Sequence, residues 1–248
     1  MSKETNKQEF NFDENLKKLD KAITNLVNKS KFISSRKQVI EVTLVLLYQM
    51  VASNIVQFGM RENPYCQKAV MVDLPKDIEE YAEEIYVFAK LIYDLYQNSE
   101  PFEDVLFHIF GSSLKYQLGQ HMTPPRLAYA LAKFVKSDKE IGTEPMLISD
   151  IACGVGGLLL SKLKTIYEDE GRDGIKRIEI VANDKDKLMC LATIIQIELH
   201  SLIHKIPYKS MCVYYSDAIT QYEPDESKTD YRFYCVIPEL EQYIKLSP

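Results

Sequence analysis

The residues best suited to chemistry lie in one glycine-rich segment, Asp-Ile-Ala-Cys-Gly-Val-Gly-Gly, at positions 150–157. An apolar run precedes it and another follows from Leu158, so the pattern predicts a strand, a glycine turn and a helix. Glycine permits positive φ and lets the backbone approach a ligand where a Cβ would clash. Leu159 replaces the third glycine of the dinucleotide fingerprint, which disfavours a nicotinamide dinucleotide. The segment therefore predicts a turn that holds another nucleotide-like ligand, or a tight structural turn.

Three further polar segments stand in a definite order around this turn. Residues 119–125 read Gly-Gln-His-Met-Thr-Pro-Pro before a predicted helix, which Thr123 can cap. Asp184 ends a second apolar strand, where a carboxylate can accept hydrogen bonds from ribose hydroxyls. Asp217 ends a third strand and can accept a hydrogen bond from an adenine amino group or cap the next turn.

Elements of two kinds must position these segments. The first half shows helical spacing of apolar residues, which predicts helices near 13–28, 35–47, 75–96 and 102–116. In the second half, strands near 146–150, 178–182, 211–215 and 232–237 alternate with helices near 125–136, 156–168, 185–203 and 239–246. This alternation favours right-handed crossovers and a mostly parallel sheet. We therefore expect an N-terminal helical bundle over residues 1–117 and a Rossmann-like α/β domain over residues 118–248.

The order of these segments resembles the N-terminal and cofactor-binding parts of the adenine-specific DNA methyltransferases of type I restriction–modification systems. Residues 119–125 are similar to that family's G-Q-[FY]-[YF]-T-P segment, and residues 150–157 to its D-P-A-C-G-S-G-G. The resemblance implies a methyltransferase fold with S-adenosylmethionine as cofactor. It also implies the cofactor contacts: Gln120 and Thr123 near the methionyl end, Asp150 at the amino group, Cys153, Gly154 and Gly156 in the turn beneath it, Asp184 at the ribose, and Asp217 at the adenine.

The catalytic motif of that family, N-P-P-[FY] at the end of its fourth strand, is degenerate here. In the family, its amide and aromatic ring hold a flipped adenine beside the cofactor. Aligned on Pro238, the asparagine is replaced by Ile237, the second proline by Glu239 and the aromatic residue by Leu240. Isoleucine has no acceptor and leucine has no ring, so these residues predict a pseudoenzyme that binds the cofactor and acts by binding a partner or DNA. Two alternatives stay open: an active DNA adenine methyltransferase, alone or completed by a second chain, and a protein-interaction module with a relic turn.

Composition limits the partners and the setting. The net charge of -6 argues against binding DNA by bulk electrostatics, so we expect DNA to be reached through a partner subunit. Five dispersed cysteines, no apolar signal core and no long apolar span favour a cytoplasmic protein without membrane contact. His200 and His204 lie on an expected helix surface without a third ligand, so no metal is predicted. The sheet is expected to be truncated after its fourth strand, which leaves an apolar edge for a partner chain or a second copy.

Overall fold

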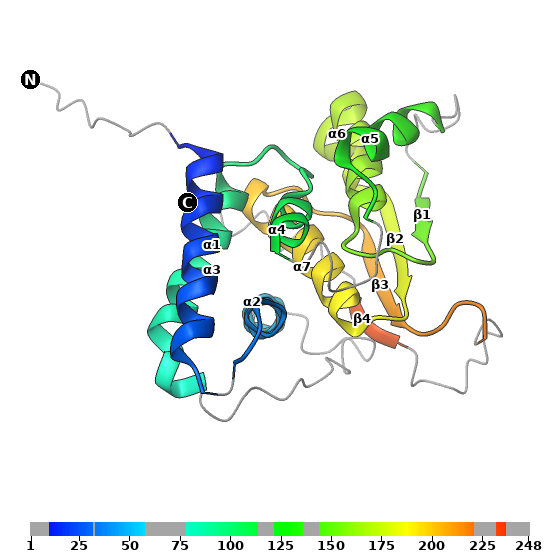
Figure 1. Cartoon of the computed structure of the whole chain (residues 1–248). Coiled ribbons are helices and arrows are strands. Elements are labelled where there is room, and N and C mark those ends of the chain that lie inside the picture. Colours follow the sequence, from blue (N-terminus) through cyan, green and yellow to red (C-terminus); the bar gives the residue numbers. More distant parts are fainter. Residues whose placement is uncertain are drawn as a thin grey trace, which may run out of the picture.

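The computed structural model describes residues 10–31, 33–57, 78–113, 122–135, 144–220 and 232–236. Its N-terminal helices are α1 (Phe12–Lys29), α2 (Arg36–Gln57), the 3-10 helix η3 (Ile78–Tyr81), α3 (Ala82–Gln97), α4 (Val105–Ser113) and α5 (Pro125–Phe134). The remaining elements are β1 (Met146–Asp150), α6 (Gly157–Lys176), β2 (Ile178–Asp184), α7 (Lys187–His204), β3 (Ser210–Tyr215) and β4 (Arg232–Val236) (Figure 1). The predicted boundary between residues 117 and 118 lies outside the described residues and stays a prediction.

The four strands form one sheet in the order β1-β2-β3-β4. β2 pairs in parallel with β1 on one side and with β3 on the other, and the helices α6 and α7 make the two crossovers. Successive parallel strands need such crossovers, and each brings a helix against the sheet. A helical N-terminal part followed by a partial Rossmann-like sheet is therefore confirmed.

The last strand is antiparallel, whereas the three strands before it are parallel. β4 pairs with β3 in the antiparallel direction, so Val236 lies opposite Met211, near the start of β3, and Arg232 lies opposite Tyr214. The alternation of strands and helices predicted a mostly parallel sheet, which agrees with the pairing of β1, β2 and β3. The end of β4 therefore lies beside the start of β3, away from Asp217, which follows the end of β3.

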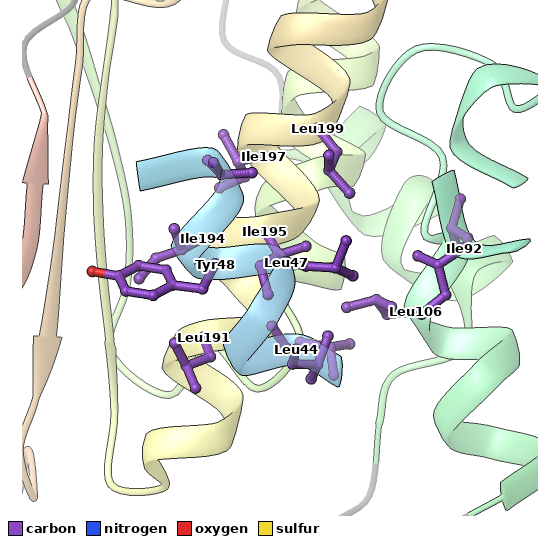
Figure 2. Close-up of a cluster of buried hydrophobic side chains, with 14 of the residues drawn as sticks. Leu44, Leu47, Tyr48, Ile92, Leu106, Leu191, Ile194, Ile195, Ile197 and Leu199 are labelled. Atoms are coloured by element: carbon purple, nitrogen blue, oxygen red, sulfur yellow. The ribbon is translucent and has the colours of Figure 1, made fainter. Parts of the chain in front are cut away.

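Helix α7 forms the centre of the molecule. Every residue from Leu188 to Ser201 is buried, because α7 lies between the sheet on one side and α2 and α3 on the other. A helix that is apolar all round needs cover all round. Figure 2 shows how the leucine and isoleucine side chains of α7 meet apolar side chains of the N-terminal helices: Leu44, Leu47 and Tyr48 from α2, Ile92 from α3 and Leu106 from α4.

The two faces of the sheet differ in cover. One face carries buried side chains, among them Ile148, Ile180 and Met211, and packs on the side where α7 and the N-terminal helices lie (Figure 1). The alternate residues face the other way: Leu147 on β1 is exposed and Val181 on β2 is half-buried, while Asn183 at the end of β2 is buried. Parallel sheets are usually covered on both faces. This second face is therefore open to a further layer.

Candidate functional site

The glycine turn begins where β1 ends. The Oδ1 atom of Asp150 accepts a hydrogen bond from the Ala152 N–H at 3.0 Å, which turns the chain away from the strand. Gly154 and Gly156 follow with φ of 55° and 89°, in the left-handed region that side chains disfavour. Gly156 then serves as the N-cap residue of α6. The positive φ angles confirm that the turn depends on glycine.

Gly156 is also needed for a close approach to α7. A Cβ at this position would lie 3.1 Å from the Thr193 Oγ1 atom, a contact tighter than side chains normally make. The Thr193 hydroxyl in turn donates to the Gly154 carbonyl at 3.0 Å. The turn is thus seated directly on the buried helix.

Asp184 fixes the turn from the neighbouring strand. One carboxylate oxygen, Oδ2, accepts from the Gly154 N–H at 2.8 Å, and the other, Oδ1, accepts from the Asp186 N–H at 2.8 Å. Asn183 also links neighbouring strand ends, because its side-chain amide donates to the carbonyls of Ile151 and Ser216. The ends of β1, β2 and β3 are therefore held together at one edge of the sheet. Sequence reasoning did not single out Asn183.

A cavity of about 400 Å³ opens at this edge, within the range of small-molecule sites. Six of the predicted cofactor residues line it: Thr123, Asp150, Cys153, Gly154, Asp184 and Asp217. Gly156 lies in the turn itself, and Gln120 and residues 237–240 lie outside the described residues. Asp104 also lines the cavity, which brings four carboxylates together with one cation, Lys185. The cavity therefore favours a ligand with positive charge.

The two capping roles predicted from the sequence, for Thr123 and Asp217, have different outcomes. Thr123 lines the cavity but does not cap the following helix: Pro124 is the N-cap residue of α5, without a side-chain hydrogen bond, so the capping prediction was wrong. The helix starts at Pro125 as predicted, and the cap position falls on Pro124, which has no side-chain donor or acceptor. Asp217 does cap its turn, since its Oδ1 atom accepts from the Ile219 N–H at 2.9 Å.

Burial sets the charge state of two groups in the turn. It raises the pKa of the Cys153 thiol to about 12, so this cysteine is a protonated packing group and no nucleophile. Burial also raises the pKa of Asp150, and the nearby Asp184 charge adds to that effect, against the Ala152 hydrogen bond. An ionised Asp150 is thus more stable when a cation is close.

A buried polar network, which sequence reasoning missed, joins the turn to the N-terminal helices. The Gln196 amide of α7 donates to the Val155 carbonyl at 2.6 Å and to the Asp104 Oδ1 atom at 2.9 Å. Its oxygen accepts from the Tyr96 hydroxyl and from the Leu106 N–H, both at 3.1 Å. Three segments distant in sequence therefore meet at one glutamine.

His200 is part of the core. The prediction placed it on a helix surface, but the side chain is fully buried, and its Nε2–H donates to the Glu103 carbonyl at 2.7 Å. The ring lies edge-on to Tyr96, with centroids 5.1 Å apart. The expectation failed because α7 is covered on every side, whereas the prediction judged His200 from its immediate neighbours in the sequence alone. In the part of the chain that the structure describes, no metal-binding cluster of three or more residues forms.

Replacing His200 by glutamine is expected to flatten the acid side of the stability profile. Burial lowers its folded-state pKa to about 3, below the value near 6.5 of an unfolded histidine, so the unfolded chain alone takes up this proton in between. Wild-type stability should therefore fall as pH drops below about 6.5, by up to about 1.4 kcal/mol per pH unit from this residue. Urea unfolding at several pH values measures the two slopes, and equal slopes would contradict a buried neutral ring.

The fold and the site define a partial Rossmann-like protein of the methyltransferase class. Residues 100–238 match the model of the family described as N-6 DNA methylase, over more than half of the chain. The chain therefore belongs to the N-6 DNA methylase family. None of the curated proteins matches the sequence significantly.

Solved structures with low sequence identity are similar over most of this chain. A class I S-adenosylmethionine-dependent methyltransferase from Listeria monocytogenes, so described, is 14% identical with a TM-score of 0.46, covering 82% of this chain and 52% of its own. A modification subunit described as part of a type I restriction enzyme of Vibrio vulnificus is 13% identical with a TM-score of 0.45, covering 83% and 56%. A type I restriction–modification methyltransferase subunit from Streptococcus thermophilus is 14% identical with a TM-score of 0.42, covering 88% and 50%. The chain thus spans about half the length of these structures.

Helices long and apolar enough to cross a bilayer are not found among the described residues.

Proposed function

We propose that this chain binds S-adenosylmethionine in the cavity beside the glycine turn and that, as a single chain, it does not transfer the methyl group. The cavity carries the first half of the proposal, since it joins a positive-φ glycine turn to the acid at the end of the next strand. The residues also fit the cofactor chemically. Four carboxylates face one lysine there, and the cofactor has a sulfonium and an ammonium group against one carboxylate.

The predicted cofactor residues take the following roles in this proposal. Asp184, at the end of β2, would face the ribose, and Asp217, shortly after β3, would face the adenine. Asp150 and Thr123 would lie toward the methionyl end. Backbone atoms of Gly154 and Gly156 would pass beneath the ligand, and Gln120 is proposed from the sequence alone. When bound, the cofactor supplies an electrophilic methyl group on sulfur.

The loss of catalysis is supported by residue types and by strand direction. Ile237 and Leu240 replace the amide and the aromatic ring that would hold an adenine. β4 runs antiparallel, so Val236 lies opposite Met211 near the start of β3, whereas Asp217 and the cavity follow its other end. The five residues of β4 span roughly 15 Å at strand geometry. Val236, the last residue of β4, therefore lies far from the proposed methyl group.

Action through a partner is supported by charge and by the open sheet face. The net charge of -6 leaves little bulk attraction for DNA. The second face of the sheet exposes Leu147, which is 60% exposed, and half-buries Val181 and Cys212. We therefore propose that a partner chain or a second copy packs against this face and brings the protein to DNA. Sedimentation equilibrium of the wild type and of Leu147→Asp distinguishes a second copy from a partner chain. Only self-association gives a wild-type dimer, and the aspartate introduced on the apolar face should then weaken that dimer.

Isothermal titration calorimetry and a methyl-transfer assay test the two halves of the proposal separately. We expect saturable binding of S-adenosylmethionine at micromolar concentration, with no binding of NAD as the control ligand. Radiolabelled methyl transfer to unmethylated DNA is expected to stay at background. Absence of heat at high micromolar cofactor would contradict the proposal that the chain binds S-adenosylmethionine. Clear turnover by the single chain would contradict the proposal that it does not transfer the methyl group.

A further inference from the structure

Asp104 is an unusual cavity residue because it belongs to the N-terminal helical part and is nearly inaccessible. It precedes α4 and is 5% exposed. Its Oδ1 atom accepts from the Phe107 N–H at 3.0 Å and from the Gln196 amide at 2.9 Å. Its Oδ2 atom is buried and has no hydrogen-bond partner in the described part of the molecule. Burying a carboxylate oxygen without a hydrogen-bond donor costs free energy of folding, so a ligand that donates to this oxygen would be bound favourably.

The position of that oxygen points to the ligand. Asp104 lines the same cavity as the glycine turn, and Oδ2 would lie 2.7 Å from a Cβ placed on Gly157. Gly157 is the first residue of α6 and lines the cavity as well. The orphaned oxygen is therefore held against the turn where a ligand would enter, and only glycine leaves room for it.

The other cavity carboxylates already have partners. Both oxygens of Asp184 accept backbone N–H groups, and one oxygen of Asp217 and one of Asp150 do the same. Among the cavity carboxylates that the structure describes, Asp104 alone has a buried oxygen without a donor. An ammonium group has three N–H donors and a positive charge, and thus supplies what Oδ2 lacks.

We propose that Asp104 binds the α-ammonium group of the amino-acid part of S-adenosylmethionine. This inference rests on the proposed cofactor binding and adds a contact from the helical part of the chain. It makes that part a component of the ligand site, beyond its role as support for α7. Burial raises the pKa of Asp104, which means that it disfavours the ionised carboxylate. A cation bound beside Asp104 would stabilise that ionised form.

Calorimetry with two nucleosides tests the contact. S-adenosylhomocysteine has the amino-acid group, and 5′-methylthioadenosine lacks it while keeping the adenosine. We expect Asp104→Asn to weaken S-adenosylhomocysteine binding about 10- to 100-fold and to leave 5′-methylthioadenosine binding within about twofold. Asp173→Asn is the matched control, because this exposed carboxylate lies outside the cavity and pairs with Lys176; the change should alter neither affinity.

The outcomes separate this inference from the proposed function. If the wild type binds neither nucleoside, cofactor binding itself is wrong; if Asp104→Asn weakens both nucleosides equally, or neither, the ammonium contact is wrong. Retained 5′-methylthioadenosine binding reports a folded cavity, and Asp104→Ser, which keeps an acceptor for the Phe107 N–H, replaces the asparagine variant if that one unfolds. A second readout is pH: wild-type affinity for S-adenosylhomocysteine should fall in acid as Asp104 and Asp150 protonate, because burial raises the pKa of both carboxyls. The variant should keep only the part of this dependence that is due to Asp150.

Discussion

Replacing Gln196 by methionine is expected to lower the free energy of unfolding by about 3–5 kcal/mol. The side chain is fully buried and makes four hydrogen bonds, to the Tyr96 hydroxyl, the Leu106 N–H, the Asp104 carboxylate and the Val155 carbonyl. Methionine has similar length but offers none of these bonds, so four buried polar groups lose a partner. The loss is greater than for an ordinary core substitution because the orphaned groups come from three different segments.

Urea unfolding measures this loss, and Gln97 provides the control. Gln97 is the last residue of α3, is exposed and makes one side-chain contact, a 3.4 Å hydrogen bond to the Tyr93 hydroxyl. Its replacement by methionine should change stability by less than about 0.5 kcal/mol. A loss below about 1 kcal/mol at Gln196 would mean that water satisfies the network, and that the glutamine does not join the two parts of the chain.

The local signals of the sequence were enough to locate the strands and the turn. The run that ends at Asp150, the glycines that follow and the acid at 184 each depend on residues close together, and β1 ends where the pattern predicted. Glycine at a positive φ is dictated by its own neighbours. The resemblance to a family, carried by the same local motifs, placed Thr123 and Asp217 at the ligand, and the structure brings both to the cavity.

Contacts between distant segments were not visible in the same way. Asp104 and Gln196 are 92 positions apart, and each reads in isolation as an ordinary helix-start acid or a lone polar residue. One signal could have found Gln196. The helix over 185–203 is apolar on all sides, which predicts full burial, and a glutamine inside such a helix must have partners.

The direction of β4 could not be read from its residues. Five residues with alternating side chains fit a parallel or an antiparallel partner equally well, so the antiparallel pairing of β4 with β3 is visible only in the structure. The expected roles of Gln120, Ile237, Pro238, Glu239 and Leu240 lie outside the described residues and stay predictions.

Replacing Asp184 by alanine is expected to weaken S-adenosylhomocysteine binding at least 100-fold and to cost about 2–4 kcal/mol of stability. The carboxylate accepts the N–H groups of Gly154 and Asp186, and each would be left without its acceptor in a buried site. Release of Gly154 would let the turn relax away from the cavity. The proposed ribose contact, made through the remaining lone pairs of the same two oxygens, would be lost as well.

The neighbouring acid separates ligand binding from general loss of structure. Asp186 caps α7 by accepting the Leu188 N–H at 2.9 Å and does not line the cavity. Asp186→Ala should therefore cost about 1 kcal/mol of stability and change the affinity less than about threefold. Because Asp184 holds the turn through the Gly154 N–H and is the proposed ribose contact, its loss should reduce affinity even at temperatures where both variants remain folded. An Asp184→Ala variant that binds as tightly as Asp186→Ala would show that this carboxylate neither contacts the ligand nor is needed to hold the turn at the cavity.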